Sequence, residues 1–350
     1  MKKMLAMLLA LVMILGLAAC ASTKPAADAT ATSEPSNTGD SASAETSAEA
    51  SDAAPAESGK TYTVGVCQLI QHEALDAATQ GFIDALKEEL GDAVTVDVQN
   101  ASGDSVNCGT IVNGFVAKGV DLIMANATPA LTAAVSATAD IPILGTSITA
   151  YGVALDIDDF SGTVGGNVSG TSDLADLQKQ AQMILDWFPE TKTVGLLFCS
   201  AEPNSRYQID EVRKALEAQG VTCEEFAFTD SNDVSSVTQK AADFSDVVYI
   251  PTDNTAASNT EAIANVLIPA SVPAICGEEG LCRGCGVATL SISYYDLGVT
   301  TGKMAAKILK GEANISEMPV EYTDATPKYN ASICDQLGIT PLDGYEAIEG

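Results

Sequence analysis

From about residue 61 onward, the chain alternates between two patterns of apolar residues. Short runs rich in Val, Ile and other apolar residues are typical of buried strands, and longer stretches with apolar residues at helical spacing separate them. The predicted strands are Thr63–Cys67, Val94–Val98, Val120–Ala125, Ile141–Thr146, Val194–Cys199, Thr222–Phe228, Val247–Ile250, Pro273–Cys276 and Val287–Ile292. The predicted helices are Glu73–Leu90, Ser105–Lys118, Pro129–Thr138, Leu174–Phe188, Ser205–Gln219, Val234–Phe244, Thr255–Leu267 and Tyr295–Lys310. The alternation predicts an α/β fold with buried parallel sheets and helices on both faces.

The same pattern occurs twice. Thr63-Val64-Gly65-Val66 opens the first set of units and Thr193-Val194-Gly195-Leu196 the second, and a Gly-rich passage over 162–170 lies between them. Two doubly wound lobes fit this organisation better than one very large sheet. We expect lobe 1 to comprise 61–172 plus 294–320, and lobe 2 to comprise 173–293 plus 321–345, with crossing segments that form a hinge.

The N-terminus has the organisation of a lipoprotein export signal. Two lysines precede an almost unbroken apolar stretch over 4–17, and small residues lead to Cys20. A transmembrane helix is the alternative, but the stretch is shorter than the roughly 20 residues that a span needs. We therefore expect 1–19 to be removed and Cys20 to carry lipid, which would anchor an extracytoplasmic protein to the cell membrane.

The segment after Cys20 is low in hydrophobicity. Residues 21–60 contain no Leu, Ile, Val, Phe, Tyr, Trp or Met, so 20–60 is expected to be a disordered tether. The whole chain has a formal charge of −30 from 17 basic and 47 acidic residues. This balance argues against nucleic-acid binding and against adhesion to anionic lipids. A monomer is expected.

Signals for catalysis or metal binding are weak. Cys282 and Cys285 have the spacing of a redox or metal pair, but His72 is the only histidine and no second pair follows. A local disulfide and inert thiols remain alternatives, with inert thiols favoured. The chain also lacks a G-x-S-x-G motif and a phosphate-loop signature. We expect no enzyme activity, no cofactor and no metal.

A ligand site is expected beyond the carboxyl ends of the strands, where open parallel sheets bind their ligands. This rule selects the loops Gln68–His72, Asn126–Pro129, Ser200–Ser205, Pro251–Asn254 and Gly277–Gly280. Thr128 is expected to cap a helix that starts at Pro129, and Asn204 and Ser205 lie at the start of another. Such helix N-termini favour an anionic group, such as a carboxylate. The alternative is that these residues only cap helices.

Two acidic residues in these loops are candidates for binding an ammonium group. Asp253 follows a fully apolar strand and Glu278 lies on the next loop; helix capping or solvation is the alternative for both. Gln68 and His72 are candidates for the side-chain pocket of the ligand, although a lone histidine is more often structural.

Several motifs occur in an order and spacing that resemble a known family. They are Val66-Cys67-Gln68, His72-Glu73-Ala74-Leu75-Asp76, Gln99-Asn100-Ala101, Asn126-Ala127-Thr128-Pro129-Ala130, Asn167-Val168-Ser169-Gly170-Thr171-Ser172-Asp173-Leu174, Asn204-Ser205, Val248-Tyr249-Ile250-Pro251-Thr252-Asp253-Asn254, Gly277-Glu278 and Tyr294-Tyr295-Asp296-Leu297-Gly298. Over about Thr61 to Ile339 the chain resembles the ABC transporter substrate-binding proteins of the tryptophan/tyrosine type.

The resemblance implies a type I periplasmic-binding-protein fold with a three-segment hinge and a ligand in the cleft. It also implies an amino-acid ligand with an aromatic or other apolar side chain, delivered to an ABC permease and its ATPase. A ligand sensor for a membrane receptor, without transport, is the alternative. The expected ligand-binding residues are Gln68, His72, Asn126, Thr128, Ser147, Asn204, Ser205, Thr252, Asp253, Asn254 and Glu278.

Overall fold

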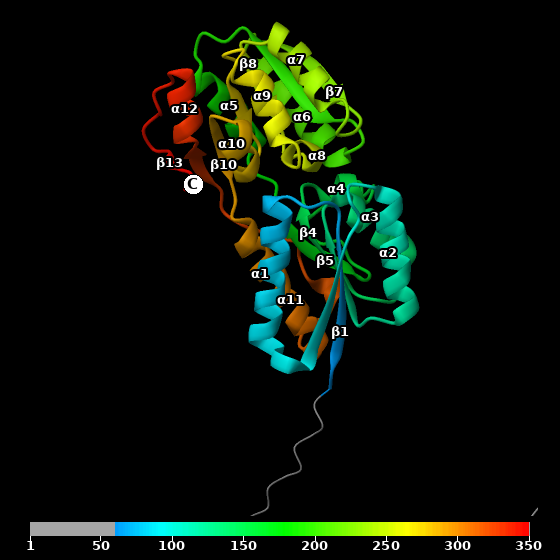
Figure 1. Ribbon diagram of the computed structural model, residues 1–350. Coiled ribbons are helices and arrows are strands. Elements are labelled where there is room, and N and C mark those ends of the chain that lie inside the picture. Colours follow the sequence, from blue (N-terminus) through cyan, green and yellow to red (C-terminus); the bar gives the residue numbers. More distant parts are fainter. Residues whose placement is uncertain (1–59, 350) are drawn as a thin grey trace, which may run out of the picture. The chain divides into compact units, whose positions relative to one another are not determined.

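The computed structural model describes residues 60–349. The expected export signal, the lipidated Cys20 and the tether lie outside the described residues. Within 60–349, no helix is both long enough and apolar enough to cross a membrane. The described chain forms two β-sheets, each covered by helices (Figure 1). We call the first sheet with its helices lobe 1 and the second sheet with its helices lobe 2.

Lobe 1 contains a fully parallel sheet in the order β11-β5-β4-β3-β1-β2. Its strands are β1 (Tyr62–Gln68), β2 (Val94–Asn100), β3 (Leu122–Asn126), β4 (Ile143–Ile148), β5 (Val168–Ser172) and β11 (Glu321–Tyr322). Its helices are α1 (Glu73–Leu90), α2 (Ser105–Lys118), α3 (Thr128–Ala137), α4 (Tyr151–Ala154) and α11 (Tyr294–Lys310), with short 3₁₀ turns at Gly91–Ala93 and Ile315–Glu317.

Lobe 2 repeats this arrangement in the order β13-β12-β10-β9-β8-β6-β7. Its strands are β6 (Thr193–Cys199), β7 (Thr222–Phe228), β8 (Val247–Ile250), β9 (Ala274–Cys276), β10 (Ala288–Ser291), β12 (Thr326–Tyr329) and β13 (Glu346–Ala347). Its helices are α5 (Leu177–Trp187), α6 (Pro203–Glu217), α7 (Val234–Phe244), α8 (Asn254–Ala257), α9 (Thr260–Leu267), α10 (Glu279–Cys285) and α12 (Ala331–Leu337). All strand pairs are parallel except β10 with β12.

Alternate residues of the central strands enter separate hydrophobic cores on the two faces of each sheet. In β6, Leu196 and Phe198 belong to one core, whereas Leu197 and Cys199 belong to the other. Because both faces are covered, these strands are apolar at nearly every position, which is the pattern expected for buried parallel sheets. The predicted fold class, two doubly wound parallel lobes, is confirmed.

The chain passes between the lobes three times. It crosses after β5, again between β10 and α11, and again between β11 and β12. β11 pairs with β5 through Glu321 and Tyr322, which places these two residues in the first sheet, just past the expected boundary at 320. The Gly-rich passage over 162–170 contains the start of β5, a strand that was absent from the predicted set.

Helices α1 and α11 lie side by side along lobe 1 (Figure 1). Glycines allow this close approach. A Cβ atom at Gly298 would collide with the backbone carbonyl of Ala78, and one at Gly81 would collide with the carbonyl of Tyr295. Because α11 is the segment that returns from lobe 2, this contact fixes the second crossing segment to lobe 1.

Candidate functional site

A small inner cavity lies between the two lobes. From lobe 1 and the crossing segments it is lined by His72, Leu75, Ser147, Asp173 and Tyr294, and from lobe 2 by Asn204, Thr252, Asp253, Asn254, Ala257 and Glu278. In the shape described, its volume is about 10 Å³, close to the lower limit for one water molecule. No lysine or arginine lines it.

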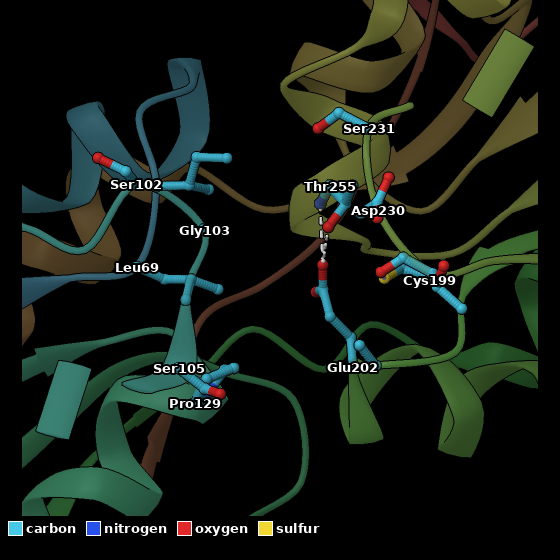
Figure 2. A pocket seen from close by; sticks show the side chains of 13 residues that line it. Leu69, Ser102, Gly103, Ser105, Pro129, Cys199, Glu202, Asp230, Ser231 and Thr255 are labelled. Carbon is cyan, nitrogen blue, oxygen red and sulfur yellow. Dashed lines mark hydrogen bonds between the residues drawn. The ribbon is translucent and has the colours of Figure 1, made fainter. Parts of the chain in front are cut away.

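A larger cavity of about 190 Å³, which we call the outer cavity, is lined by other residues of both lobes. Figure 2 shows its two walls facing each other. Leu69, Ile70, Ser102, Gly103, Ser105 and Pro129 form the lobe 1 wall, and Cys199, Ala201, Glu202, Thr229, Asp230, Ser231 and Thr255 form the lobe 2 wall. Its lining comes from the segments that follow β1, β2 and β3 in lobe 1 and β6, β7 and β8 in lobe 2, at the carboxyl ends of these strands. The segments after β2 and β7 were not among the loops expected from the sequence.

Glu202 organises the lobe 2 wall. It is 4% exposed, and its Oε1 accepts hydrogen bonds of 2.8 Å from both the backbone N–H and the hydroxyl of Thr255. Its Oε2 accepts from the backbone N–H of Asn254 at 3.0 Å and from the Asn254 side chain at 2.7 Å. The carboxylate therefore fixes the first residues of α8 against the start of α6.

Asp253 caps helix α8 and ties three loops together. Its Oδ1 accepts from the backbone N–H of Ala256 at 2.8 Å, and its Oδ2 accepts from Cys199 N–H at 2.6 Å and from the Ser205 hydroxyl at 2.7 Å. Burial and the neighbouring Glu202 raise the pKa of Asp253 above its usual range. The capping alternative for this residue is therefore realised in the structure.

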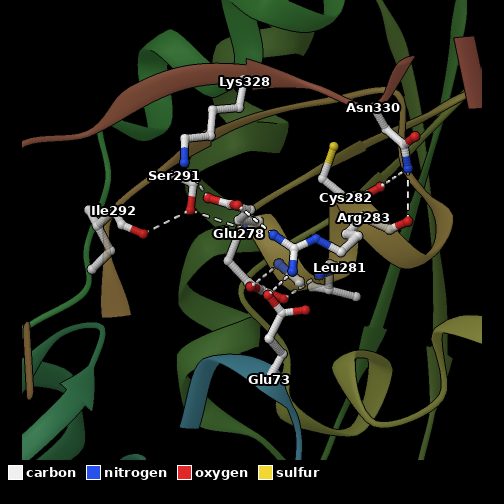
Figure 3. A network of polar contacts seen from close by, with 11 residues as sticks. Glu73, Glu278, Leu281, Cys282, Arg283, Ser291, Ile292, Lys328 and Asn330 are labelled. Atoms are coloured by element: carbon white, nitrogen blue, oxygen red, sulfur yellow. Dashed lines mark hydrogen bonds and ion pairs between the residues drawn. The ribbon is translucent and has the colours of Figure 1, made fainter. Parts of the chain in front are cut away.

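Glu278 caps helix α10 and lines the inner cavity. It accepts from the backbone N–H of Gly280 at 2.6 Å and of Leu281 at 2.5 Å. Burial raises its pKa to about 7. Beside it, Arg283 bonds Glu279 in the same helix and Glu73 at the start of α1 in lobe 1 (Figure 3). An ion pair therefore joins the two lobes at the edge of the cavity.

The first crossing segment contributes a further buried carboxyl, Asp173. It is 5% exposed and accepts hydrogen bonds from the Thr149 hydroxyl at 3.0 Å and from the Tyr294 hydroxyl at 2.9 Å. Burial raises its pKa. Ser147 lies nearby on β4 with a positive φ of 56°. That left-handed conformation is uncommon for a serine, and the buried Ser147 hydroxyl has no hydrogen-bond partner.

His72 belongs to the same side of the cavity and lies immediately before α1. Its Nε2 is 3.2 Å from the side-chain oxygen of Asn254 in lobe 2, and its Nδ1 is buried without a partner. Burial lowers the pKa of His72, which favours the neutral ring. His72 precedes α1 without capping it through its side chain.

Seven of the predicted ligand-binding residues line the inner cavity: His72, Ser147, Asn204, Thr252, Asp253, Asn254 and Glu278. The other four do not. Gln68 bonds Asp76 and Thr79 on the side of α1, and Asn126 is fully buried beneath α1, where it donates to the Leu75 carbonyl. Thr128 is buried within α3, and the Ser205 hydroxyl donates a hydrogen bond to Asp253.

Two predicted helix caps are wrong by position. The N-cap of α3 is Ala127, with a φ of 91°, and Thr128 is already the first helical residue. The N-cap of α6 is Glu202, so Asn204 and Ser205 lie inside its first turn. Asn204 instead donates to the Thr252 carbonyl at 3.1 Å, which leaves its side-chain oxygen buried without a partner.

Sequence reasoning missed Asp173, Tyr294 and Glu202 as site residues. Asp173 and Tyr294 both fall in motifs that carried the family resemblance, and that was the available signal. Glu202 precedes a Pro-Asn-Ser helix start, where an acidic residue is an ordinary finding.

Neither metal binding nor disulfide bonding is seen in the part of the chain that the structure describes. Among residues 60–349, no group of three or more His, Cys, Asp or Glu side chains is placed to hold a metal ion. Cys282 and Cys285 both lie in α10 as buried free thiols. Burial raises the pKa of Cys282, which makes its thiol unreactive.

Comparisons with known proteins agree with this architecture. Residues 63–344 match the family model described as ABC transporter substrate binding protein. A tyrosine-binding protein of Clostridioides difficile (strain R20291) is 32% identical over 276 residues, which are 77% of this chain and 79% of that protein.

Two solved structures share both sequence and fold with the chain. One is an ABC domain from Streptococcus pneumonia in complex with L-Trp: it is 32% identical, with a TM-score of 0.78, and the match covers 83% of this chain and 100% of that one. The other is the ligand-free, open structure of a substrate binding protein with adhesive properties from Clostridium difficile. It is also 32% identical, with a TM-score of 0.63 and coverage of 83% and 99%.

The family match, the order of the strands and the cavity between the lobes all indicate the same class of protein. The two lobes have the architecture of type I periplasmic-binding proteins, and the family is one of solute binding rather than catalysis. The chain belongs to the ABC transporter substrate-binding protein family.

Proposed function

We propose that this protein captures an amino acid with an aromatic or other apolar side chain between its two lobes, as the solute-binding component of an ABC importer. The observation that carries the proposal is the inner cavity. Its lining combines buried hydrogen-bond donors and buried hydrogen-bond acceptors, and both lobes contribute to it. The relatives that bind tyrosine and tryptophan give the ligand class.

Capture requires the lobes to move apart and close. An inner cavity of about 10 Å³ admits no amino acid, so a ligand of that size enters only if the walls separate. Three crossing segments provide a hinge for such a motion. The higher TM-score to the L-Trp complex than to the open structure, at equal identity, supports an arrangement near the closed form.

The N-terminus of α1 is the proposed site for the carboxylate of the ligand. His72 and Leu75, at the start of this 18-residue helix, line the cavity, and no side chain caps the first turn. Its first backbone N–H groups and the positive end of its dipole favour an anion. Thr128, at the start of α3, lies outside the inner cavity and is less suited to this role.

Calorimetry of residues 60–350 against the twenty amino acids tests the ligand class. We expect binding of one or more aromatic or large apolar amino acids. Failure of every amino acid to bind would remove the proposal.

The membrane arrangement is proposed from the N-terminal sequence. Cys20 carries lipid, holds a monomeric receptor outside the cytoplasm and keeps it near a permease and its ATPase. Labelling cells with a fatty-acid probe tests the anchor: the full chain should incorporate the probe and a Cys20→Ala variant should not. Equal labelling of both would exclude Cys20 as the lipid site, and co-purification with the permease would test the transport partnership.

A further inference from the structure

Three carboxyl groups line the inner cavity, and two of them already have structural partners. Asp253 accepts two backbone N–H groups and a hydroxyl, and Glu278 accepts two backbone N–H groups. Each caps a helix of lobe 2. Because backbone donors are fixed in place, neither carboxylate can turn towards a ligand without uncapping its helix.

Asp173 has a different set of partners. Its side chain accepts hydrogen bonds from two hydroxyl groups, those of Thr149 and Tyr294, and it caps no helix. One bond reaches each oxygen, so a second acceptor position remains on each, as it does in Glu278. Unlike the backbone donors of Glu278, the two hydroxyl donors can rotate, so Asp173 can turn towards a ligand without uncapping a helix. A carboxylate with no cationic partner is costly to bury, and no lysine or arginine lines this cavity. The contact that would offset this cost is a cation within the cavity.

Two other buried oxygen atoms in the same cavity lack a partner. They are the side-chain oxygen of Asn204 and the hydroxyl of Ser147. The orientation of the Asn204 amide is set by its nitrogen, which donates to the Thr252 carbonyl. A primary ammonium has three N–H donors, which equals the number of acceptors that Asp173, Asn204 and Ser147 offer.

We propose that Asp173 binds the ammonium group of the ligand, with Asn204 and Ser147 as the second and third acceptors. Tyr294 and Thr149 are positioning residues that hold the carboxylate. The site thereby selects ligands with a primary ammonium group over their deaminated counterparts. The inference rests on the proposed function, and it replaces Asp253 and Glu278 as ammonium-binding candidates.

The test compares two pairs of ligands on matched variants. The ligands are L-tyrosine and L-tryptophan, each with its deaminated analogue, 3-(4-hydroxyphenyl)propanoate or 3-(indol-3-yl)propanoate. Asp173→Asn keeps the shape of the side chain and removes its charge. Asp158→Asn, in an exposed loop, removes the same charge elsewhere and is the control.

We expect Asp173→Asn to raise the Kd for the amino acids by about 10- to 100-fold, the range typical of a hydrogen bond to a charged group. The Kd for the deaminated analogues should stay within about twofold, and Asp158→Asn should match the wild type throughout. Tyr294→Phe removes one donor to Asp173 while keeping the ring. It should weaken amino-acid binding selectively but less, and it keeps the inference testable if Asp173→Asn fails to fold.

The outcomes separate the two proposals. If the wild type binds none of the amino acids tested by calorimetry, the proposed function fails. If the wild type binds L-tyrosine or L-tryptophan, but Asp173→Asn binds the same ligand equally well, only the role of Asp173 fails. Equal weakening of an amino acid and its deaminated analogue would also overturn that role, because the variant would then have damaged the cavity as a whole.

Discussion

Replacing Glu202 by Gln should destabilise lobe 2 strongly for a conservative change. The buried carboxylate accepts five hydrogen bonds, from the start of α8 and from Asn204. Whichever way the new amide turns, its NH₂ group faces the backbone N–H of either Asn254 or Thr255. That N–H loses its acceptor in a buried position.

The expected loss is about 3 kcal/mol. One buried unsatisfied N–H costs about 1–3 kcal/mol, and hydrogen bonds that lose their charge weaken by about 1 kcal/mol each. Relief of the repulsion that raises the pKa of Asp253 offsets part of this loss. With an unfolding entropy of about 2.1 cal/mol/K per residue, about 3 kcal/mol corresponds to a fall of roughly 4–5 °C in Tm for a chain of this size.

The assay is equilibrium urea denaturation followed by tryptophan fluorescence. Trp187 is the single tryptophan and lies in a core of lobe 2, so the signal reports the lobe that is perturbed. Glu261→Gln, exposed in the first turn of α9, is the matched control and should change stability by less than about 0.5 kcal/mol. A loss below about 1 kcal/mol for Glu202→Gln would refute the account of Glu202 as the organiser of this wall.

Three other features lead to measurable expectations. Glu73→Gln breaks the half-exposed ion pair to Arg283 across the lobes. The rate of ligand release in stopped-flow experiments should therefore rise by up to about fivefold, and by less at high salt. An unchanged rate would show that this pair does not hold the lobes together. Burial raises the pKa of Glu278 to about 7, above its ordinary value of 4.5, so the folded state holds the proton more tightly. The Tm should therefore rise as the pH falls from about 8 to about 5, with a smaller rise for Glu278→Gln at constant ionic strength; equal slopes in both proteins would contradict this reading. Gly298→Ala should cost about 1–3 kcal/mol in chemical denaturation because the new methyl group collides with the backbone of α1. Gly114→Ala, exposed in α2 with open space around it, should be neutral or stabilising by up to about 1 kcal/mol, and equal effects at both glycines would argue against the steric explanation.

The apolar pattern predicted most of the fold because most strands are buried on both faces. Thr222–Phe228, Val247–Ile250 and the helix Glu73–Leu90 match the structure residue for residue. β5 was not predicted because its sequence, Val-Ser-Gly-Thr-Ser, contains only one large apolar residue. Gly170 in this strand has a φ of 143° and lies against the backbone of Gly145, a close approach that excludes a larger residue. Such a constraint is tertiary and leaves no local pattern.

The missed strand explains the missed carboxyl. The rule that ligands bind beyond strand ends selected loops correctly, but it could be applied only to strands that had been predicted. Asp173 directly follows β5, so the rule did not select it. The misplaced caps have a second cause: Ala127 caps α3 with a positive φ, a conformation that an alanine rarely adopts and that its residue type does not signal.

The glycine contact between α1 and α11 has a consequence for protein engineering. Leu75 lies in the first turn of α1, and Tyr294 is the first residue of α11. Since the two helices approach within backbone contact, they form one packed unit, and this unit places both side chains in the wall of the cavity. A biosensor designer who grafts new selectivity into this scaffold should transplant both helices as a unit.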